Sequence, residues 1–588
     1  MENRITGVKV ETNGIMEKAV DFVLNNQFRK TTSWEKAVEV FSTREDSHDE
    51  FWRGEFFGKQ MRGAALIYEY TKDEDLYKIL TDAVIDLLSR QDELGRFSTY
   101  TVEKEFRGWD MWSRKYVLVG MIYYLKICKD ESLKQTIISA CKKHLDYIIS
   151  KVGDGEGKID ITKTSCWWGC VNSCTILEPT IEIFKLTDEK RYFDFAEYII
   201  SKGGCSDCNL IDLALKNEIY PYQYPVTKAY EMMSFYEGLL AYYEVTGKTL
   251  YLDAVTRFLD AVEKSDLTII GCSGCTHELF DNSSKMQTEY HENIMQETCV
   301  TVTWMRVNRR LFELTGEAKY MDRFEKSGYN ALYGSLNTEM NKQMSMFTKE
   351  YVEAGAFDSY SPLYMNTRGR GLGGYCAFAS GGYNGCCLAI GACGIALMPL
   401  SAVMQNDEKV YVNLLSGGVF SVKDKNGKFV DIEIKTNYPS SGNATITVLG
   451  ESSLSLNLRN PAWCEKMTVN GEEVCGEYFT LSKDFSAGET LEVCMQMQLK
   501  AHVLNGKIAF TYGPLTLATD EHKNQRDIKT PLQLNGEIKC QEKPTEGLEL
   551  VHFDCEIGDE SVVLTDYQSC GKKWLTDKPL MTVWFNGK

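Results

Sequence analysis

A helical repeat in the first two thirds of the chain limits the folds that it can adopt. Five similar breaks interrupt aromatic-rich amphipathic stretches, and they read YEYTKDEDLY, LKICKDESL, FKLTDEKRY, YEVTGKTLY and FELTGEAKY. The breaks fall at Thr71, Cys128, Thr187, Thr246 and Thr315. Successive breaks lie about 57, 59, 59 and 69 residues apart, which suits one helical hairpin and a connecting loop per unit. The sequence therefore predicts helical hairpins in series.

Local chemistry explains these breaks. Thr, Gly and Asp end one helix, and Asp or Glu then lies near the positive N-terminus of the next. Between breaks, runs such as YLDAVTRFLDAVEK carry apolar residues at helical spacing. Hairpins in series can form an open solenoid or a closed toroid. The connecting loops, such as EFRGWDMW and TSCWWGCVNS, are long and rich in Trp and Gly. Loops of this kind usually build a binding site, which favours a closed α/α barrel.

The sequence pattern changes after about residue 403. Segments such as KVYVNLLSGGVFSV, ATITVLG and KIAFTYGPLTLAT alternate apolar and polar residues between Gly, Asn and Pro. This predicts an all-β region made of two small sandwiches, which supports the barrel or, alternatively, binds sugar. We assign 11–403 to the α/α barrel, 404–505 to the first β-sandwich and 506–588 to the second. Residues 1–10 form an N-terminal segment that can add a strand to the β region.

Composition excludes several classes of partner. The formal net charge of the 588 residues is −18, and no long basic run occurs, which argues against nucleic acid and anionic membranes. No stretch of about 18 apolar residues could span a membrane, and the N-terminus MENRITGVKVETNG lacks the apolar core of a signal peptide. Twenty cysteines in such a chain indicate a reducing cytoplasm. We expect a small-molecule partner, and a homodimer is possible.

The most informative cluster of reactive residues comes from HENIMQETC and the later GGYNGCC. These motifs supply Glu297, Cys299, Cys386 and Cys387. Three thiolates and one carboxylate can complete a tetrahedral zinc site. Adjacent cysteines reach one metal only where the backbone bends, and Gly385 allows such a bend. The spacing alone also allows the alternative that these are four unrelated buried residues and not a metal site.

Other cysteines offer competing sites. Two pairs have C-x-x-C spacing: Cys205 with Cys208, and Cys272 with Cys275. They could share a structural zinc, but about 64 residues separate the pairs, far more than in a zinc ribbon. A third set has helical spacing: Cys166, Cys170 and Cys174. That spacing places them on one helix face, and we interpret them as packing residues.

Several motifs together resemble a known family. The segment ETCVTVTWMRVNRRLFELTGEAKYMDRFEKSGYNALYGSLN resembles the signature of glycoside hydrolase family 127, typified by bacterial β-L-arabinofuranosidases. The cysteine pair at 386–387, LRNPAWCEKMTVNGE at 458–472 and YGPL at 512–515 fit the same family. The resemblance covers most of the chain. It implies an α/α barrel followed by β-sandwich domains, and a retaining exo-glycoside hydrolase acting on a glycoside or small oligosaccharide.

The resemblance also implies roles for the cluster. Glu297, Cys299, Cys386 and Cys387 match the family's ligands for Zn²⁺, and Cys386 matches its nucleophile. Metal coordination deprotonates a cysteine at neutral pH, and a thiolate could attack an anomeric carbon.

The expected general acid/base is Glu278, in the segment CTHELFDN. It would protonate the leaving oxygen and then deprotonate the attacking water, so the two steps retain configuration. Asp281 and Glu289 are neighbouring alternatives for this role.

The sequence departs from the family at positions that hold the sugar. Better-known members place histidines on barrel helices, whereas WDMWSRKY offers Ser113 or Arg114 and YPVTKAYEMM offers Lys228. If Arg114 and Lys228 bind substrate, the sugar could be acidic or a branched component of pectin. If they are solvated charges, they carry no such information. Leu388 and Ala389 follow the cysteine pair, where prolines are common in the family.

Aromatic residues in the loops are candidates for stacking on sugar faces. These are Trp109, Trp112, Trp167, Trp168 and Tyr383, and some of them must be core. We predict Trp109 and Tyr383, with Arg114 and Lys228, to be substrate-binding residues.

Two other classes of function remain possible. One is a different α/α-barrel sugar enzyme, such as a uronyl hydrolase or an epimerase, which would need acidic or histidine catalysts and no zinc thiolates. The other is a non-catalytic sugar-binding relative, against which the intact Cys386 and Glu278 argue. Metal analysis distinguishes the first class from the predicted enzyme.

Overall fold

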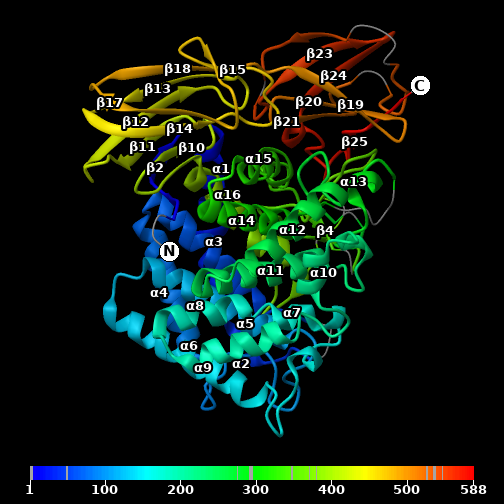
Figure 1. Cartoon of the computed structure of the whole chain (residues 1–588). Coiled ribbons are helices and arrows are strands. Elements are labelled where there is room, and N and C mark those ends of the chain that lie inside the picture. Colours follow the sequence, from blue (N-terminus) through cyan, green and yellow to red (C-terminus); the bar gives the residue numbers. More distant parts are fainter. Residues whose placement is uncertain are drawn as a thin grey trace.

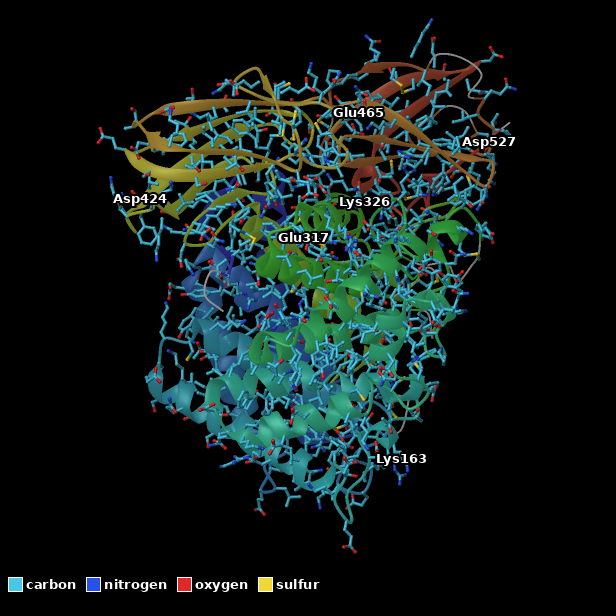
Figure 2. All side chains as sticks on the ribbon, viewed as in Figure 1. Lys163, Glu317, Lys326, Asp424, Glu465 and Asp527 are labelled. Atoms are coloured by element: carbon cyan, nitrogen blue, oxygen red, sulfur yellow. A yellow bond between two sulfur atoms is a disulfide. The ribbon has the colours of Figure 1, made fainter. Side chains whose placement is uncertain are left out.

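The structure is a computed structural model. It describes residues 4–47, 51–274, 276–290, 296–345, 348–369, 371, 373–378, 380–524, 527–533, 538–545 and 547–587. A helical body contains most of the first 402 residues, and two β regions lie next to each other along one side of it (Figure 1). Charged side chains such as Lys163, Glu317 and Glu465 are exposed on the outside (Figure 2). Within the described part of the chain, the helices are too short or too polar to cross a bilayer.

The helical body is a closed ring. Its inner helices are α3 (Glu55–Thr71), α5 (Asp110–Ile127), α8 (Leu177–Thr187), α11 (Ala229–Thr246), α14 (Thr298–Thr315) and α16 (Cys386–Ala402). Each inner helix packs on the next, and α16 packs back on α3. This closure confirms the predicted α/α barrel and excludes an open solenoid.

An outer layer of helices covers the ring. These helices are α4 (Glu74–Ser89), α6 (Glu131–Lys151), α9 (Lys190–Ser201), α12 (Thr249–Ser265) and α15 (Ala318–Ser327). They alternate with the inner helices along the chain, as a series of hairpins requires. The remaining α-helices of the described residues are α1 (Ile15–Val23), α2 (Thr31–Thr43), α7 (Val171–Cys174), α10 (Leu210–Lys216) and α13 (Ser283–Met286).

The repeated threonines end inner helices. Thr71, Thr187, Thr246 and Thr315 are the last residues of α3, α8, α11 and α14. Each hydroxyl donates to the carbonyl four residues earlier, at 2.8–2.9 Å. Each also accepts from the backbone N–H two residues later. One side chain thus satisfies groups on both sides of the break.

The first β region is a sandwich of two sheets. The first sheet runs β1 (Thr6–Gly7), β9 (Val403–Gln405), β10 (Val410–Val412), β14 (Ser452–Arg459) and β17 (Tyr478–Phe485). The second runs β16 (Glu472–Glu473), β15 (Met467–Val469), β18 (Glu489–Met495), β13 (Asn443–Val448), β12 (Phe429–Thr436), β11 (Gly418–Lys423) and β2 (Lys9–Thr12). The N-terminal strands β1 and β2 therefore join one sheet each, pairing with β9 and β11.

The second β region is built on one antiparallel sheet. Its order is β19 (Leu499–Leu504), β20 (Lys507–Tyr512), β21 (Leu515–Asp520), β24 (Glu560–Asp566), β23 (His552–Ile557) and β22 (Lys539–Glu542). β25 (Met581–Thr582) pairs with β21, and β26 (Phe585–Asn586) pairs with β20. Because β19 begins at Leu499, this sheet starts within the range assigned above to the first sandwich.

Buried polar contacts tie this sheet to the barrel. The Arg368 side chain donates to the carbonyls of Gly334, Tyr567 and Cys570 at 2.7–2.8 Å. Short two-stranded antiparallel pairs complete the barrel loops: β3 (Gln296–Glu297) with β6 (Tyr360–Ser361), β4 (Gln343–Met344) with β5 (Tyr351–Val352), and β7 (Cys376–Ala377) with β8 (Tyr383–Asn384). The β3–β6 pair leads directly into α14 and helps to position the site described below.

Candidate active site

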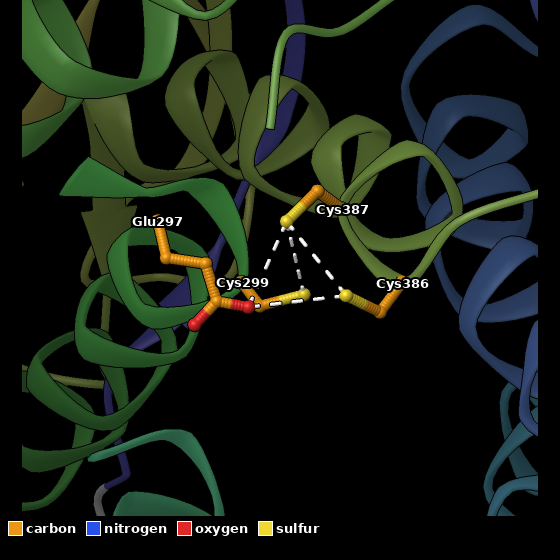
Figure 3. A group of neighbouring side chains, drawn as sticks. All are labelled: Glu297, Cys299, Cys386 and Cys387. Atoms are coloured by element: carbon orange, nitrogen blue, oxygen red, sulfur yellow. Dashed lines mark hydrogen bonds between the residues drawn. The ribbon is translucent and has the colours of Figure 1, made fainter. Parts of the chain in front are cut away.

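The predicted ligand residues meet where two inner helices begin. Glu297 ends β3 and directly precedes α14, and Cys299 lies in the first turn of that helix. Cys386 and Cys387 are the first residues of α16, after the extended Gly385. Figure 3 shows the three sulfurs and the carboxylate pointing toward one another. Among the described residues, they form the group of potential ligands whose atoms lie within 4.8 Å of one another.

The spacing of these atoms suits a metal ion. The Sγ atom of Cys387 lies 3.6 Å from that of Cys299 and 3.8 Å from that of Cys386. Glu297 Oε1 lies 3.7 and 3.8 Å from the sulfurs of Cys387 and Cys386. Tetrahedral zinc–ligand bonds would separate two sulfurs by about 3.8 Å and a sulfur from an oxygen by about 3.5 Å. The residues therefore fit such an ion.

Burial distinguishes one cysteine from the others. Cys299 and Cys387 are fully buried, whereas Cys386 is half-buried. Hydrogen bonds from the other two thiols lower the pKa of Cys386 well below its usual value, helped by the charges of Lys59 and Lys228. Burial raises the pKa of Cys299 and Cys387. Cys386 is thus the thiol of the three that is best placed to be an exposed thiolate.

A cavity of about 400 Å³ opens over this cluster, at the N-terminal ends of the inner helices. Of the four cluster residues, Cys386 and Glu297 line it. Gly374 also lines it with a φ of 58°, and a side chain there would collide with Cys386. Glycine is therefore required where the backbone passes over the sulfur.

Glu278 lies in the same cavity, half-buried, with its carboxylate fixed at both oxygens. Tyr360 donates to Oε1 at 2.6 Å, and Lys228 forms an ion pair with Oε2. His277 and Glu278 have φ values of 51° and 64°, an unfavourable backbone that is typical of functional sites.

The alternative acid/base residues lie outside the lining of this cavity. Asp281 accepts hydrogen bonds from Thr276 N and from the Ser283 hydroxyl. Glu289 is exposed. The geometry therefore favours Glu278 over either neighbour.

An acid–base pair on α3, which the sequence analysis missed, forms the floor of the cavity. Lys59 is fully buried, and its Nζ lies 3.1 Å from Glu55 and 4.0 Å from Cys299 Sγ. Trp112 donates to the other Glu55 oxygen. Burial raises the pKa of Glu55 to about 7, against the opposing charge of Lys59. The sequence could have revealed this pair, because two opposite charges lie one helical turn apart in the apolar stretch GEFFGKQM.

Further residues of the lining also went unpredicted: Trp52, Tyr230, Glu231 and Tyr360. Glu231 is 2% exposed, and its Oε2 has no hydrogen-bond partner among the described residues. The predicted Lys228, Trp109, Trp112, Trp167 and Trp168 do line the cavity.

Two of the predicted substrate-binding residues lie elsewhere. Arg114 is fully buried and pairs with Asp110 at 2.9 Å and with Glu105 at 2.8 Å. It lies about 200° around α5 from Trp112, so it points away from the cavity. Tyr383 is outside the cavity lining, because the β7–β8 hairpin packs it on Tyr375, with ring centroids 5.5 Å apart. Neither side chain lines the cavity, so the structure gives no support to these two predictions.

The structure also shows where the other cysteines lie. Cys205 and Cys208 are neighbours, with sulfurs 3.4 Å apart, whereas the Cys272 thiol contacts the carbonyl of Glu297 at 3.5 Å. Cys275 lies outside the described residues.

Cys166, Cys170 and Cys174 do not share a helix face, and that expectation is wrong. Trp168, Gly169 and Cys170 have φ values of 52°, 57° and 61°, so a left-handed turn interrupts the helix. Helical spacing alone could not reveal this turn.

Comparisons with known proteins identify the family and the fold. The family model for the β-L-arabinofuranosidase GH127 catalytic domain matches residues 6–353, and that for the GH127 middle domain matches 409–497. Among proteins of curated function, none matches the chain significantly.

Solved structures share the fold over the whole chain. A GH127 β-arabinofuranosidase is similar with a TM-score of 0.75 and 18% identity, covering 99% of this chain and 98% of its own. A GH127 β-L-arabinofuranosidase from Geobacillus stearothermophilus T6 has a TM-score of 0.73 and 18% identity, covering 98% of this chain and 100% of its own. Since the matched catalytic-domain model spans more than half of the 588 residues, the protein is a glycoside hydrolase and belongs to family 127.

Proposed function

We propose that the protein is a retaining, exo-acting β-L-arabinofuranosidase in which Cys386 is the nucleophile and Glu278 the general acid/base. One observation supports this most directly. The half-buried Cys386 and the carboxylate of Glu278 line one cavity, while the other two thiols of the cluster are buried behind it. A nucleophile and an acid that share one cavity are what a two-step glycoside hydrolysis requires.

Glu297, Cys299, Cys386 and Cys387 would hold the metal, which we propose to be zinc. Two features support this choice: Glu297 Oε2 has no hydrogen-bond partner in the described part of the chain, and the donor set is rich in sulfur. When bound, zinc keeps its thiol ligands deprotonated at neutral pH. Lys59, buried beside Cys299, would offset the negative charge of the thiolates.

In the first step, Cys386 Sγ attacks the anomeric carbon and the glycosidic C–O bond breaks. Glu278 donates its proton to the departing oxygen, which leaves as an alcohol, and a thioglycosyl enzyme forms. In the second step, Glu278 removes a proton from water, whose oxygen attacks the same carbon and displaces the Cys386 thiolate. Each step inverts the carbon, so the configuration is retained overall. Tyr360 and Lys228 hold the Glu278 carboxylate in place throughout.

Lys228 supports a second candidate substrate, an acidic or branched sugar derived from pectin. It lines the cavity and is 8% exposed. Its ammonium group is already paired with Glu278, however, so a sugar carboxylate would have to compete for it. This favours the neutral arabinofuranoside.

Active-site labelling tests the proposal. The protein, purified with its metal under reducing conditions, is first assayed on a panel of glycosides that includes β-L-arabinofuranosides and acidic sugars. It is then treated with an epoxide or haloacetamide shaped like the best substrate, and the adduct is located by mass spectrometry. We expect hydrolysis of the β-L-arabinofuranoside and an adduct on Cys386. An adduct on Glu297 would replace the proposal with two-carboxylate chemistry, in which the cysteines serve only a structural metal.

A further inference from the structure

Two adjacent tryptophans at the cavity have no role in the chemistry above. Trp167 and Trp168 both line the cavity, and Trp167 is 39% exposed. Their ring centroids lie 6.4 Å apart, with the planes inclined by 30°. Two roughly parallel indole faces that reach solvent are unusual on a protein surface, because their apolar area is not buried.

The backbone that presents these rings is strained and braced. Trp168, Gly169 and Cys170 are all left-handed, which is unfavourable for residues that carry a Cβ. Ser206 N donates to Gly169 O at 2.8 Å, and Cys170 N donates to Trp167 O at 2.8 Å. Strain that neighbouring segments hold in place is typical of ligand-binding positions.

The two tryptophans lie on the side of the cavity where the leaving group would depart. Lys228 Nζ lies 5.7 Å from the centroid of the Trp168 ring, and the same ammonium group pairs with Glu278. Trp168 is therefore close to the residue that protonates the leaving oxygen. The part of the substrate beyond that oxygen is the aglycone, so it would meet this surface.

We infer that Trp167 and Trp168 form an aglycone subsite that stacks on a second sugar ring. The inference rests on the proposed function, because it places the leaving group beside Glu278. The C–H faces of a furanose or pyranose fit an indole face. The substrate class is then an oligosaccharide with a neutral sugar next to the terminal residue, since a methyl aglycone would leave the two rings uncovered.

A matched pair of substrates tests this subsite. One is methyl β-L-arabinofuranoside, and the other is a disaccharide with the same terminal sugar linked to a second ring. For Trp167→Ala and Trp168→Ala, we expect the ratio of kcat/KM for the disaccharide to that for the methyl glycoside to fall roughly 10-fold. Tyr220→Ala is the control: this residue is 42% exposed, stacks on Tyr222 and lies outside the cavity lining. An unchanged ratio in both tryptophan variants would overturn the inference.

Gly169→Ala tests the turn without removing either ring. A Cβ there would lie 3.0 Å from Asp207 Cγ, on a backbone with φ of 57°. We expect the same fall in the ratio, with a thermal transition that shows the variant to be folded.

A binding experiment distinguishes failure of the subsite from failure of the proposed function. Full-length Cys386→Ser is titrated with the disaccharide, and tryptophan fluorescence is followed. A response that Trp167→Ala removes supports the subsite even if the wild-type protein hydrolyses no arabinofuranoside. A response that both tryptophan substitutions leave intact contradicts it, whatever the activity.

Discussion

The two ends of the barrel differ in how their charges are compensated. Each end holds a cavity of about 400 Å³ lined by the inner helices. At the C-terminal ends of these helices, the lining arginines all have carboxylate partners within the described residues. The pairs are Arg4 with Glu244 and Glu313, Arg306 with Glu178 and Glu237, Arg309 with Glu313, and Arg310 with Glu182 and Glu244.

The N-terminal end leaves polar groups without such compensation. Among the described residues, the buried Glu231 and Glu297 each have an oxygen without a hydrogen bond and no ion-pair partner. Glu178, at the other end, also has an oxygen without a hydrogen bond, but it pairs with Arg306. Three thiols and a carboxylate converge there. Charge density alone therefore does not mark the site. The site is marked by buried groups that lack a partner within the protein. Leaving such groups unpaired costs free energy, so they are expected to bind a metal or a substrate. Substitutions at the N-terminal end should alter chemistry, and those at the C-terminal end should alter stability.

The largest effect should follow loss of a metal ligand. The protein as purified should hold about one zinc per chain, and Cys299→Ser should reduce this to roughly one tenth, because a neutral hydroxyl replaces a thiolate. Elemental analysis measures the metal content. Cys205→Ser is the control, since Cys205 pairs with Cys208 outside the cluster, and it should keep the metal. Full zinc retention in Cys299→Ser would refute the metal site.

The next largest effect compares one glutamate from each end. Glu278→Gln should lower kcat/KM about 10²–10⁴-fold for substrates with poor leaving groups, because nothing then protonates the departing oxygen. Activated aryl glycosides should suffer less at the glycosylation step. Glu244→Gln, at the opposite end, should stay within about 2-fold of wild-type activity while lowering the melting temperature. Steady-state kinetics on both substrate types and thermal unfolding provide the measurements.

Equal and small losses on both substrate types in Glu278→Gln would assign the acid/base role to Asp281 or Glu289. A large activity loss in a folded Glu244→Gln variant would break the comparison between the two ends.

Local features of the sequence predicted the barrel well. Thr71, Thr187, Thr246 and Thr315 end helices through hydrogen bonds within a few residues of themselves, so the pattern reads directly from the chain. The cysteine pair at 386–387 was also visible, because adjacent cysteines and a preceding glycine are a local signal.

Residues that other segments bring to the site were harder to predict from the sequence. Lys59 and Tyr360 reach the cavity from segments far from Cys386 and Glu278 in sequence, and no local pattern connects them. Arg114 was predicted to bind substrate from its charge alone, without the direction of its side chain. Two residues along α5 from Trp112, it faces Asp110 and Glu105. A helix face must be assigned before a charge is assigned to a site.

A third prediction concerns the ion pairs of the C-terminal end. Arg306 is 8% exposed and bridges Glu178 and Glu237 at 3.2 and 3.0 Å. Arg306→Met leaves two buried carboxylates without their partner, so the free energy of unfolding should fall by about 3–5 kcal/mol. Arg191→Met, which removes an exposed pair with Asp146, should cost less than about 1 kcal/mol. Denaturant unfolding at pH 7 compares the two variants.

The pH dependence of this loss has a definite sign. Burial acts to raise the pKa of Glu178, but Arg306, Lys115 and Arg62 outweigh it and bring the value to about 2. A pKa below the unfolded value of about 4.3 contributes stability above pH 4.3 that is lost as the pH falls toward 2. The difference in the free energy of unfolding between wild type and Arg306→Met should therefore become smaller below pH 4. If that difference instead grew as the pH falls, this account of the Arg306 ion pairs would be contradicted.

The smallest effect concerns the threonine that ends α11 at the same end of the barrel. Thr246 Oγ1 donates to Tyr242 O at 2.9 Å and accepts from Lys248 N at 3.3 Å. Thr246→Ala removes both bonds at a partly exposed helix end, where water replaces them in part, so the loss should be only about 0.5–1.5 kcal/mol. Thr246→Ser keeps the hydroxyl and should recover most of the stability, which a loss due to packing would not do. Neither variant should change kcat/KM, because the residue lies at the end of the barrel whose lining arginines are already paired with carboxylates. A lower kcat/KM in Thr246→Ala, measured well below its melting temperature, would mean that the two ends are coupled through α11, since that helix begins beside Lys228 and Glu231.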